Sequence, residues 1–157
     1  MRGYSVIACV SLKCPPNFGG VLRAASCYDA AMVILDAPRF HNGADNVSKT
    51  ERHIPLVVGS VEESRPYGCE MVVVEITPNA KPLPDFKHPA RAIYLFGPED
   101  GSVPKRLIDK AQHVVCVPTA YCMNLAATVN VVLYDRLAKQ LRHDRPLTFA
   151  TTEEGRR

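Results

Sequence analysis

Five short runs of apolar residues, each nearly unbroken and rich in β-branched side chains, dominate the chain. A strand covered on both faces of a parallel sheet stays apolar along its length, whereas a half-solvated strand alternates. Segments with helical spacing separate the runs, and alternating strands and helices indicate an α/β layer fold. We therefore expect a mainly parallel sheet with helices on both faces. The expected strands are Tyr4–Leu12, Ala31–Ala37, Met71–Ile76, Arg91–Gly97 and His113–Pro118.

The intervening segments predict three helices, at Gly20–Ala30, Pro104–Gln112 and Asn124–His143, and a weak helical turn at Gly59–Ser64. Apolar residues of the last helix fall on one stripe with 3.6-residue spacing. A chain of 157 residues suits one domain. We expect that domain over residues 1–146, and a flexible polar tail over 147–157 because that stretch lacks periodicity.

Composition excludes several classes of protein. Lys and Arg number 19 against 16 Asp and Glu, so the net charge of +3 is compatible with a polyanionic partner. No apolar run approaches the ~20 residues that cross a bilayer, and no signal peptide opens the sequence, so we expect a cytoplasmic protein with no membrane span. The six cysteines form no C-x-x-C pair, which favours reduced thiols and no metal site. The 13 prolines lie mostly in the expected connections.

Loops at the carboxyl ends of parallel strands are where α/β proteins bind ligands. The first such loop, residues 14–20, contains Asn17 and paired glycines and leads into a helix that carries Arg23. Taken alone, Asn17 could cap the helix and Arg23 could be a solvated surface residue. Neither G-x-G-x-x-G nor a P-loop pattern is present, which argues against a dinucleotide or nucleotide-triphosphate site.

Two later loops carry further polar residues. Residues 96–104 include Glu99 and Asp100, which could equally serve as an acidic first helical turn that complements the helix dipole. Residues 118–125 include Asn124, for which a helix cap is the default interpretation.

In this order and at these spacings, the three loops closely resemble those of the SpoU/TrmH group of RNA ribose 2′-O-methyltransferases, in the SPOUT superfamily. Asn17–Arg23 (NFGGVLR) matches the first motif, N-x-G-x-x-x-R. Leu95–Gly101 (LFGPEDG) matches the second, an apolar strand running into G-[SP]-E. Cys122–Leu125 (CMNL) is similar to the third, S-[LM]-N-[LV]. The resemblance covers residues 4 to about 142 and is strongest to small tRNA wobble-ribose methyltransferase-like members.

The resemblance implies a deep C-terminal trefoil knot, S-adenosyl-L-methionine as cofactor, an RNA substrate and a homodimer whose active sites use both chains. It implies a catalytic group, consisting of Arg23, Asn17, Glu99 and Asn124. It also implies a cofactor site, consisting of Ile76, Leu95, Gly97, Glu99, Gly101, Val117, Cys122, Met123 and Leu125. Cys122 stands where many relatives have serine, and a thiol is a weaker hydrogen-bond donor.

A guanidinium with a pKa above ~12 is a poor base. We therefore expect Arg23 to pair with a substrate phosphate and polarise the ribose hydroxyl. We expect further RNA contacts, mostly to phosphate. The candidates are Arg2, Arg39, His41, Lys49, Arg52 and Arg65.

The function expected from these residues is S-adenosylmethionine-dependent 2′-O-ribose methylation of RNA, with tRNA as substrate. Three alternatives remain open at this point. They are an rRNA ribose methyltransferase, a catalytically weakened RNA-binding or assembly factor that retains the knotted fold, and a flavodoxin-like small-ligand binder.

Overall fold

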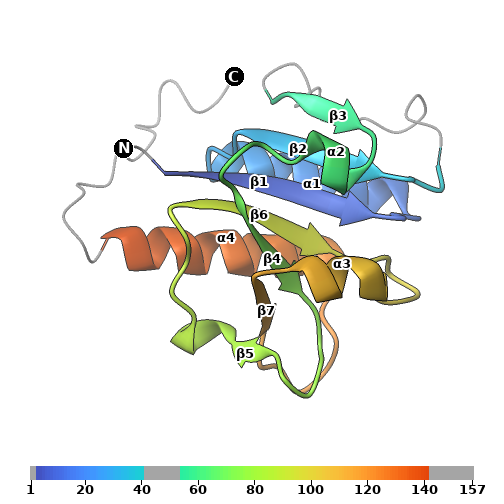
Figure 1. The fold of residues 1–157 in the computed structure, drawn as a ribbon. Helices are drawn as coiled ribbons and strands as arrows, with labels where there is room; N and C mark the ends of the chain where they lie inside the picture. The colour runs from blue at the N-terminus through green and yellow to red at the C-terminus, as the bar shows by residue number, and fades with distance from the viewer. Residues whose placement is uncertain (1–2, 41–53, 142–157) are drawn as a thin grey trace, which may run out of the picture.

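A computed structural model describes residues 3–40 and 54–141 of the chain (Figure 1). The strands are β1 (Tyr4–Val10), β2 (Met32–Asp36), β3 (Leu56–Val58), β4 (Glu70–Val74), β5 (Lys81–Pro82), β6 (Arg91–Phe96) and β7 (His113–Cys116). The helices are α1 (Pro15–Cys27), α2 (Val61–Ser64), α3 (Lys105–Lys110) and α4 (Leu125–Leu141), with a 3-10 turn at Leu83–Asp85. The predictions for Arg2, His41, Lys49, Arg52 and the tail 147–157 lie outside the described residues.

The strands form one seven-stranded sheet in the order β3-β2-β1-β6-β4-β7-β5, and all its pairings are parallel. Successive side chains of a strand face opposite sides of a sheet. Along β1, Ile7 and Cys9 pack in one core cluster while Val6, Ala8 and Val10 pack in the other. All five are nearly or fully inaccessible to solvent. The expected parallel sheet, buried on both faces, is thereby confirmed.

Helices α1 and α4 cover one face of the sheet, and α2 and α3 cover the other (Figure 1). The contact between α1 and α4 depends on a small residue, because a Cβ on Gly20 would lie 2.6 Å from the Cβ of Ala126. Any larger side chain there would push the two helices apart. The glycine thus sets the distance between the elements that carry the first and third motifs.

The structure corrects the expected start of the first helix. Residues 15–20 are helical, because α1 begins at Pro15 rather than at Gly20. Proline is tolerated in the first helical turn, where its missing N–H has no helical partner to lose. Asn17 therefore lies inside the helix and is not its N-cap, which is Cys14. Strands β3 and β5 were also not expected from the sequence.

A buried polar network fixes α4 against the start of β6. Arg136 is 5% exposed and donates hydrogen bonds to the carbonyls of Pro89 (2.6 Å) and Ala90 (2.8 Å) and to the Tyr94 hydroxyl (3.1 Å). His88 bridges the Tyr94 hydroxyl and the Asp135 carboxylate at 2.6 and 2.8 Å. The Asp135 carboxylate can only accept, so Nε2 of the neutral His88 ring carries the proton and Nδ1 accepts the hydrogen bond of the Tyr94 hydroxyl.

Membrane-spanning helices and metal clusters are both absent from the described residues. None of the helices within residues 3–40 and 54–141 has the length and apolar character required to span a membrane. The same residues bring together no group of three or more His, Cys, Asp or Glu side chains suited to a metal ion. The six cysteines are free thiols, and burial raises the pKa of Cys9 to about 12.

Candidate active site

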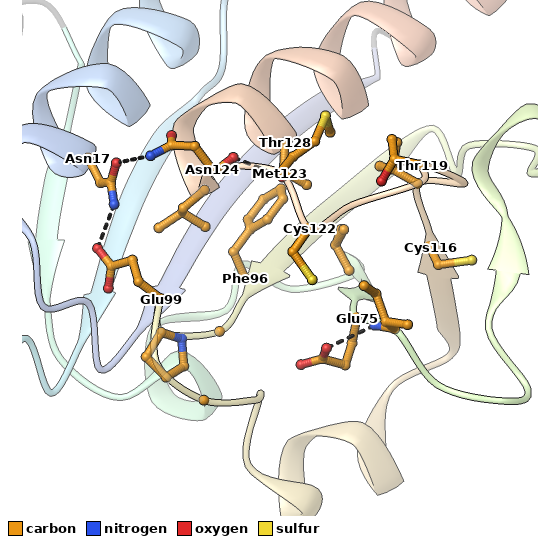
Figure 2. A pocket seen from close by; sticks show the side chains of 17 residues that line it. Asn17, Glu75, Phe96, Glu99, Cys116, Thr119, Cys122, Met123, Asn124 and Thr128 are labelled. Carbon is orange, nitrogen blue, oxygen red and sulfur yellow. Dashed lines mark hydrogen bonds between the residues drawn. The ribbon is translucent and has the colours of Figure 1, made fainter.

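A cavity of about 470 Å³ opens at the carboxyl ends of β4, β6 and β7, where the loops after these strands meet the start of α4 (Figure 2). This volume lies within the range of small-molecule and cofactor sites. The lining includes eight of the nine residues expected to bind cofactor, namely Ile76, Gly97, Glu99, Gly101, Val117, Cys122, Met123 and Leu125. The fold therefore gathers these residues from three separate loops around one space.

Leu95 differs from the expectation. Its side chain is fully buried in the core beneath α2 and α3, and it does not line the cavity. Neighbouring residues of a strand face opposite sides of the sheet. Phe96, one residue later, is therefore the β6 side chain that forms the cavity wall.

A chain of hydrogen bonds joins the three motifs at this cavity (Figure 2). The Asn124 amide donates to Oδ1 of Asn17 over 2.7 Å, and the Asn17 amide donates to Oε1 of Glu99 over 2.8 Å. Asn17 is 8% exposed, so both of these bonds are sheltered from water at its end. Asn124 also caps α4, because its Oδ1 accepts the backbone N–H of Ala126 at 2.9 Å. The cap and the contact between motifs are thus made by one side chain.

Glu99 accepts hydrogen bonds from the segment that leads into α1 as well as from Asn17. Its two carboxylate oxygens accept the backbone N–H groups of Lys13 and Cys14, each at 3.0 Å. Partial burial raises the pKa of Glu99, but these hydrogen bonds and that from Asn17 outweigh it and hold the pKa below the ordinary value. Glu99 is therefore an ionised carboxylate that anchors the second-motif loop to the start of α1.

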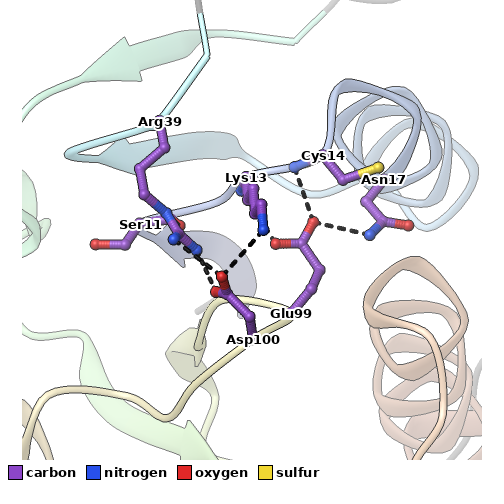
Figure 3. Close-up of polar contacts among 7 residues, drawn as sticks. All are labelled: Ser11, Lys13, Cys14, Asn17, Arg39, Glu99 and Asp100. Carbon is purple, nitrogen blue, oxygen red and sulfur yellow. Dashed lines mark hydrogen bonds and ion pairs between the residues drawn. The ribbon is translucent and has the colours of Figure 1, made fainter.

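Asp100, next in the chain, makes a second bridge between the same elements (Figure 3). It pairs with the Arg39 guanidinium through both carboxylate oxygens and with Nζ of Lys13 at 3.3 Å. Arg39 also donates from Nε to the Ser11 carbonyl at 2.9 Å. The hydrogen bond from Arg39 lowers the pKa of Asp100 strongly. Arg39, a candidate RNA contact, is therefore already paired in the free protein.

Arg23 lies away from the cavity. Its side chain is exposed on α1, does not line the cavity, and makes no hydrogen bond or ion pair with any residue in the described parts of the chain. Its helix is nevertheless tied to the cavity wall through Asn17. Within one chain, the structure therefore brings together Asn17, Glu99 and Asn124 but not Arg23.

Glu75 is a cavity residue that the sequence analysis missed. It follows β4 directly, and its carboxylate accepts the backbone N–H of Ile76 at 2.8 Å (Figure 2). The same carboxylate accepts the backbone N–H of Val103 at 3.0 Å. The second bond holds the far end of the second-motif loop. The two ends of that loop lie so close together that a Cβ on Gly97 would lie 2.8 Å from the Val103 nitrogen. The available signal was a carboxylate that ends an apolar strand, at the edge where ligands bind.

Comparison with protein families decides the relationship of the chain. The model of the SpoU rRNA Methylase family matches residues 4–134. The chain belongs to the SpoU rRNA methylase family. This SpoU-family match includes the three loops that build the cavity, and it runs from β1 into α4. No curated protein matches the sequence.

Solved structures share the fold of this SpoU-family chain. One is described as giving structural insights into the 2-OH methylation of C/U34 on tRNA; it has 18% identity and a TM-score of 0.75, over 90% of this chain and 93% of that chain. AviRb from Streptomyces viridochromogenes, in complex with the cofactor AdoMet, has 18% identity and a TM-score of 0.76, over 90% of this chain and 62% of AviRb. The TrmH/SpoU tRNA modifying enzyme of A. aeolicus has 12% identity and a TM-score of 0.75, over 98% of this chain and 83% of that chain.

Proposed function

We propose that this protein is an S-adenosylmethionine-dependent RNA ribose 2′-O-methyltransferase that acts on tRNA. The observation that carries the proposal is the continuous chain of hydrogen bonds from Asn124 through Asn17 to Glu99 at the cavity. It joins all three motifs of a SpoU-family chain in one place.

The cavity fits the cofactor in size and character. About 470 Å³ is adequate for an adenine nucleoside that carries an amino-acid chain. The wall at Gly97 is backbone rather than side chain, and a Cβ there would collide with the Val103 nitrogen. Residues Gly97, Val117 and Leu125 would hold the adenine through backbone groups and small apolar surfaces, and AviRb, of the same fold, binds AdoMet. When bound, S-adenosylmethionine supplies the electrophilic methyl group.

The residues of this chain would position the ribose hydroxyl and stabilise the negative charge that develops on its oxygen. Methyl transfer needs the hydroxyl held at attack distance and relieved of its proton. We assign Arg23 to the phosphate beside that ribose, where the guanidinium polarises the hydroxyl and the proton leaves through the phosphate or water. Glu99 is occupied by three donors, so its role is to hold the loops rather than to take the proton.

The position of Arg23 supports a homodimer. The side chain is exposed and does not line the cavity of its own chain, so we infer that it acts at the cavity of a partner subunit. On α4, which packs against α1, Val131 and Tyr134 are 37% and 61% exposed and offer apolar surface for such an interface. The deep knot and a cytoplasmic location belong to the same proposal.

tRNA is the substrate that two of the similar structures support. One concerns the 2-OH methylation of C/U34 on tRNA, and the other is the TrmH/SpoU tRNA modifying enzyme of A. aeolicus. The decisive experiment incubates the protein with labelled S-adenosylmethionine and total tRNA or rRNA, followed by nucleoside mass spectrometry. We expect a 2′-O-methylated nucleoside in tRNA. Methylation of rRNA alone would support the rRNA alternative. Cofactor binding without transfer to either RNA would support the catalytically weakened factor.

A further inference from the structure

Exposed large apolar side chains are few in the described parts of the chain, and two of them belong to loops that form the cavity. Ile76, 69% exposed, lines the cavity from the loop after β4. Tyr121, 87% exposed, lies in the loop after β7, between the lining residues Thr119 and Cys122. Because β4 and β7 pair as neighbours, the two loops leave the sheet side by side. Two adjacent loops of the cavity thus each carry an exposed apolar side chain.

A hydrogen bond holds the loop that carries Tyr121, while the Tyr121 ring is exposed to solvent. The Thr119 hydroxyl donates to the Tyr121 carbonyl over 2.8 Å. The ring itself makes no aromatic contact, and its hydroxyl no hydrogen bond, with any residue of the described chain. A buried aromatic side chain removes ~150–250 Å² from water, so a ring left this exposed forgoes a large stabilisation. Such a ring is free to pack on a flat apolar ligand.

The charge of the loop shows which part of an RNA it suits. Residues 118–125 (PTAYCMNL) contain no charged side chain, so the loop offers no cation to form an ion pair with a phosphate. An aromatic face is instead the usual platform for an unstacked base, and it accepts any base because every base has a π-face.

We propose that the Tyr121 ring stacks on the nucleobase of the nucleotide whose ribose is presented to the cavity. The inference rests on the proposed RNA methyltransferase function and adds to it a base-binding subsite. Methyl transfer takes place on the ribose and does not by itself fix the orientation of the nucleotide. A ring stacked on the base would hold that orientation, with Ile76 as the second apolar wall.

The chain contains no tryptophan, which permits a direct test. Tyr121→Trp introduces the single tryptophan of the chain as a fluorescent probe and keeps an aromatic ring able to stack. Tyr67→Trp, at a tyrosine 98% exposed just before β4 and thus at the opposite edge of the sheet, is the matched control. Full-length protein with S-adenosylhomocysteine is titrated with unfractionated tRNA, and binding is measured independently by filter retention. We expect saturable quenching of Tyr121→Trp that follows binding, and none for Tyr67→Trp.

Each outcome decides the question. Binding without quenching of Tyr121→Trp would overturn the inference alone. A second result would also overturn the inference: the indole emission of Tyr121→Trp is already blue-shifted in the free protein and does not change when tRNA is added. That result would indicate that the ring packs against a second copy of the chain. Failure of the unaltered protein to bind or methylate any RNA would overturn the proposed function and this inference with it.

Kinetics give an independent readout. Stacking on one base is worth a factor of about 5 to 150 in binding. Tyr121→Ala should raise KM for tRNA by a factor in that range, while the Kd for S-adenosylmethionine stays unchanged. Tyr121→Phe keeps the ring and should behave like the unaltered protein. Equal losses for the Phe and Ala variants would assign the effect to the hydroxyl and refute stacking.

Discussion

Asn124 donates its amide proton to Oδ1 of Asn17 over 2.7 Å, although the two residues are 107 positions apart in the chain. Each asparagine also makes a second bond, Asn17 to Glu99 and Asn124 to the first turn of α4. The order of donors and acceptors is therefore fixed along the whole chain of hydrogen bonds. Any substitution that reverses one donor should be felt at the cavity.

Asn17→Asp is the sharpest test of this order. It replaces the amide that faces Glu99 by an oxygen, so two carboxylates would meet in a sheltered position. We expect a lower Tm, a loss of about 1–3 kcal/mol in the free energy of unfolding, and weaker binding of S-adenosylmethionine by calorimetry. Asn130→Asp is the control, because that amide bonds only the Ala126 carbonyl on the exposed side of α4. Equal effects of both substitutions would refute the special role of Asn17.

Glu75→Ala should damage the cavity more than the fold. It removes the acceptor for the Ile76 and Val103 N–H groups and so releases the end of the second-motif loop. We expect the Kd for S-adenosylmethionine to rise roughly 10-fold, or ~1.4 kcal/mol, with little change in Tm. Glu63→Ala, at an exposed position of α2, serves as the control. A Kd unchanged in Glu75→Ala would show that the loop keeps its conformation without this carboxylate.

Arg23→Lys should separate catalysis from binding of the cofactor. Lysine keeps the positive charge but cannot offer the planar fork of a guanidinium to a phosphate. We expect kcat to fall roughly 10- to 100-fold, while Tm and the Kd for S-adenosylmethionine remain unchanged because Arg23 makes no hydrogen bond or ion pair with the described residues of its own chain. Arg106→Lys, on α3, is the control. A normal kcat in Arg23→Lys would exclude the bidentate role.

Tyr134→Glu should dissociate the proposed dimer, since it would place a charge in the apolar face formed with Val131. Sedimentation should report a monomer whose methyl transfer is lost while its Tm changes little. Tyr67→Glu is the matched control. A dimer that persists in Tyr134→Glu would locate the interface elsewhere.

The His88 network predicts a dependence of stability on pH. Burial lowers the pKa of His88, and this outweighs the raising effect of Asp135. A folded pKa below the unfolded value of ~6.5 means that protons bind the unfolded chain more readily. Stability should therefore be constant above about pH 6.5 and decrease as the pH falls through the folded pKa.

Thermal unfolding between pH 8 and pH 5 measures this effect. His88→Gln cannot titrate, so its Tm should vary less over that range than the Tm of the unaltered protein. Identical pH profiles would assign the dependence to other groups.

Most of the sheet could be predicted from the sequence because buried parallel strands have an evident pattern. The five apolar runs correspond to β1, β2, β4, β6 and β7, with ends displaced by at most two residues. Strands β3 and β5 are three and two residues long, too short to show any periodicity. The start of α1 was predicted wrongly because prolines and glycines are typical of a turn. Here the first helical turn tolerates the prolines, and the close contact with α4 requires the small residue Gly20.

The site was predictable only as far as ordered motifs extend. Asn17, Glu99 and Asn124 meet as expected, because their loops follow β1, β6 and β7, whose carboxyl ends lie at the same edge of one parallel sheet. Glu75 belongs to no motif, and its partner Val103 is distant in sequence. Arg136 interrupts the apolar stripe of α4 with a charge whose partners are mostly backbone carbonyls, which no sequence pattern marks.

Helix α1 carries both the sheltered amide of Asn17 and, six positions later, the exposed guanidinium of Arg23. One side of this helix contributes to the cavity wall, and another side is exposed to solvent. If a ligand in the cavity shifts α1, the affinity of a molecule bound at Arg23 must change. Thermodynamic reciprocity then requires the docked molecule to change the affinity of the ligand by the same factor.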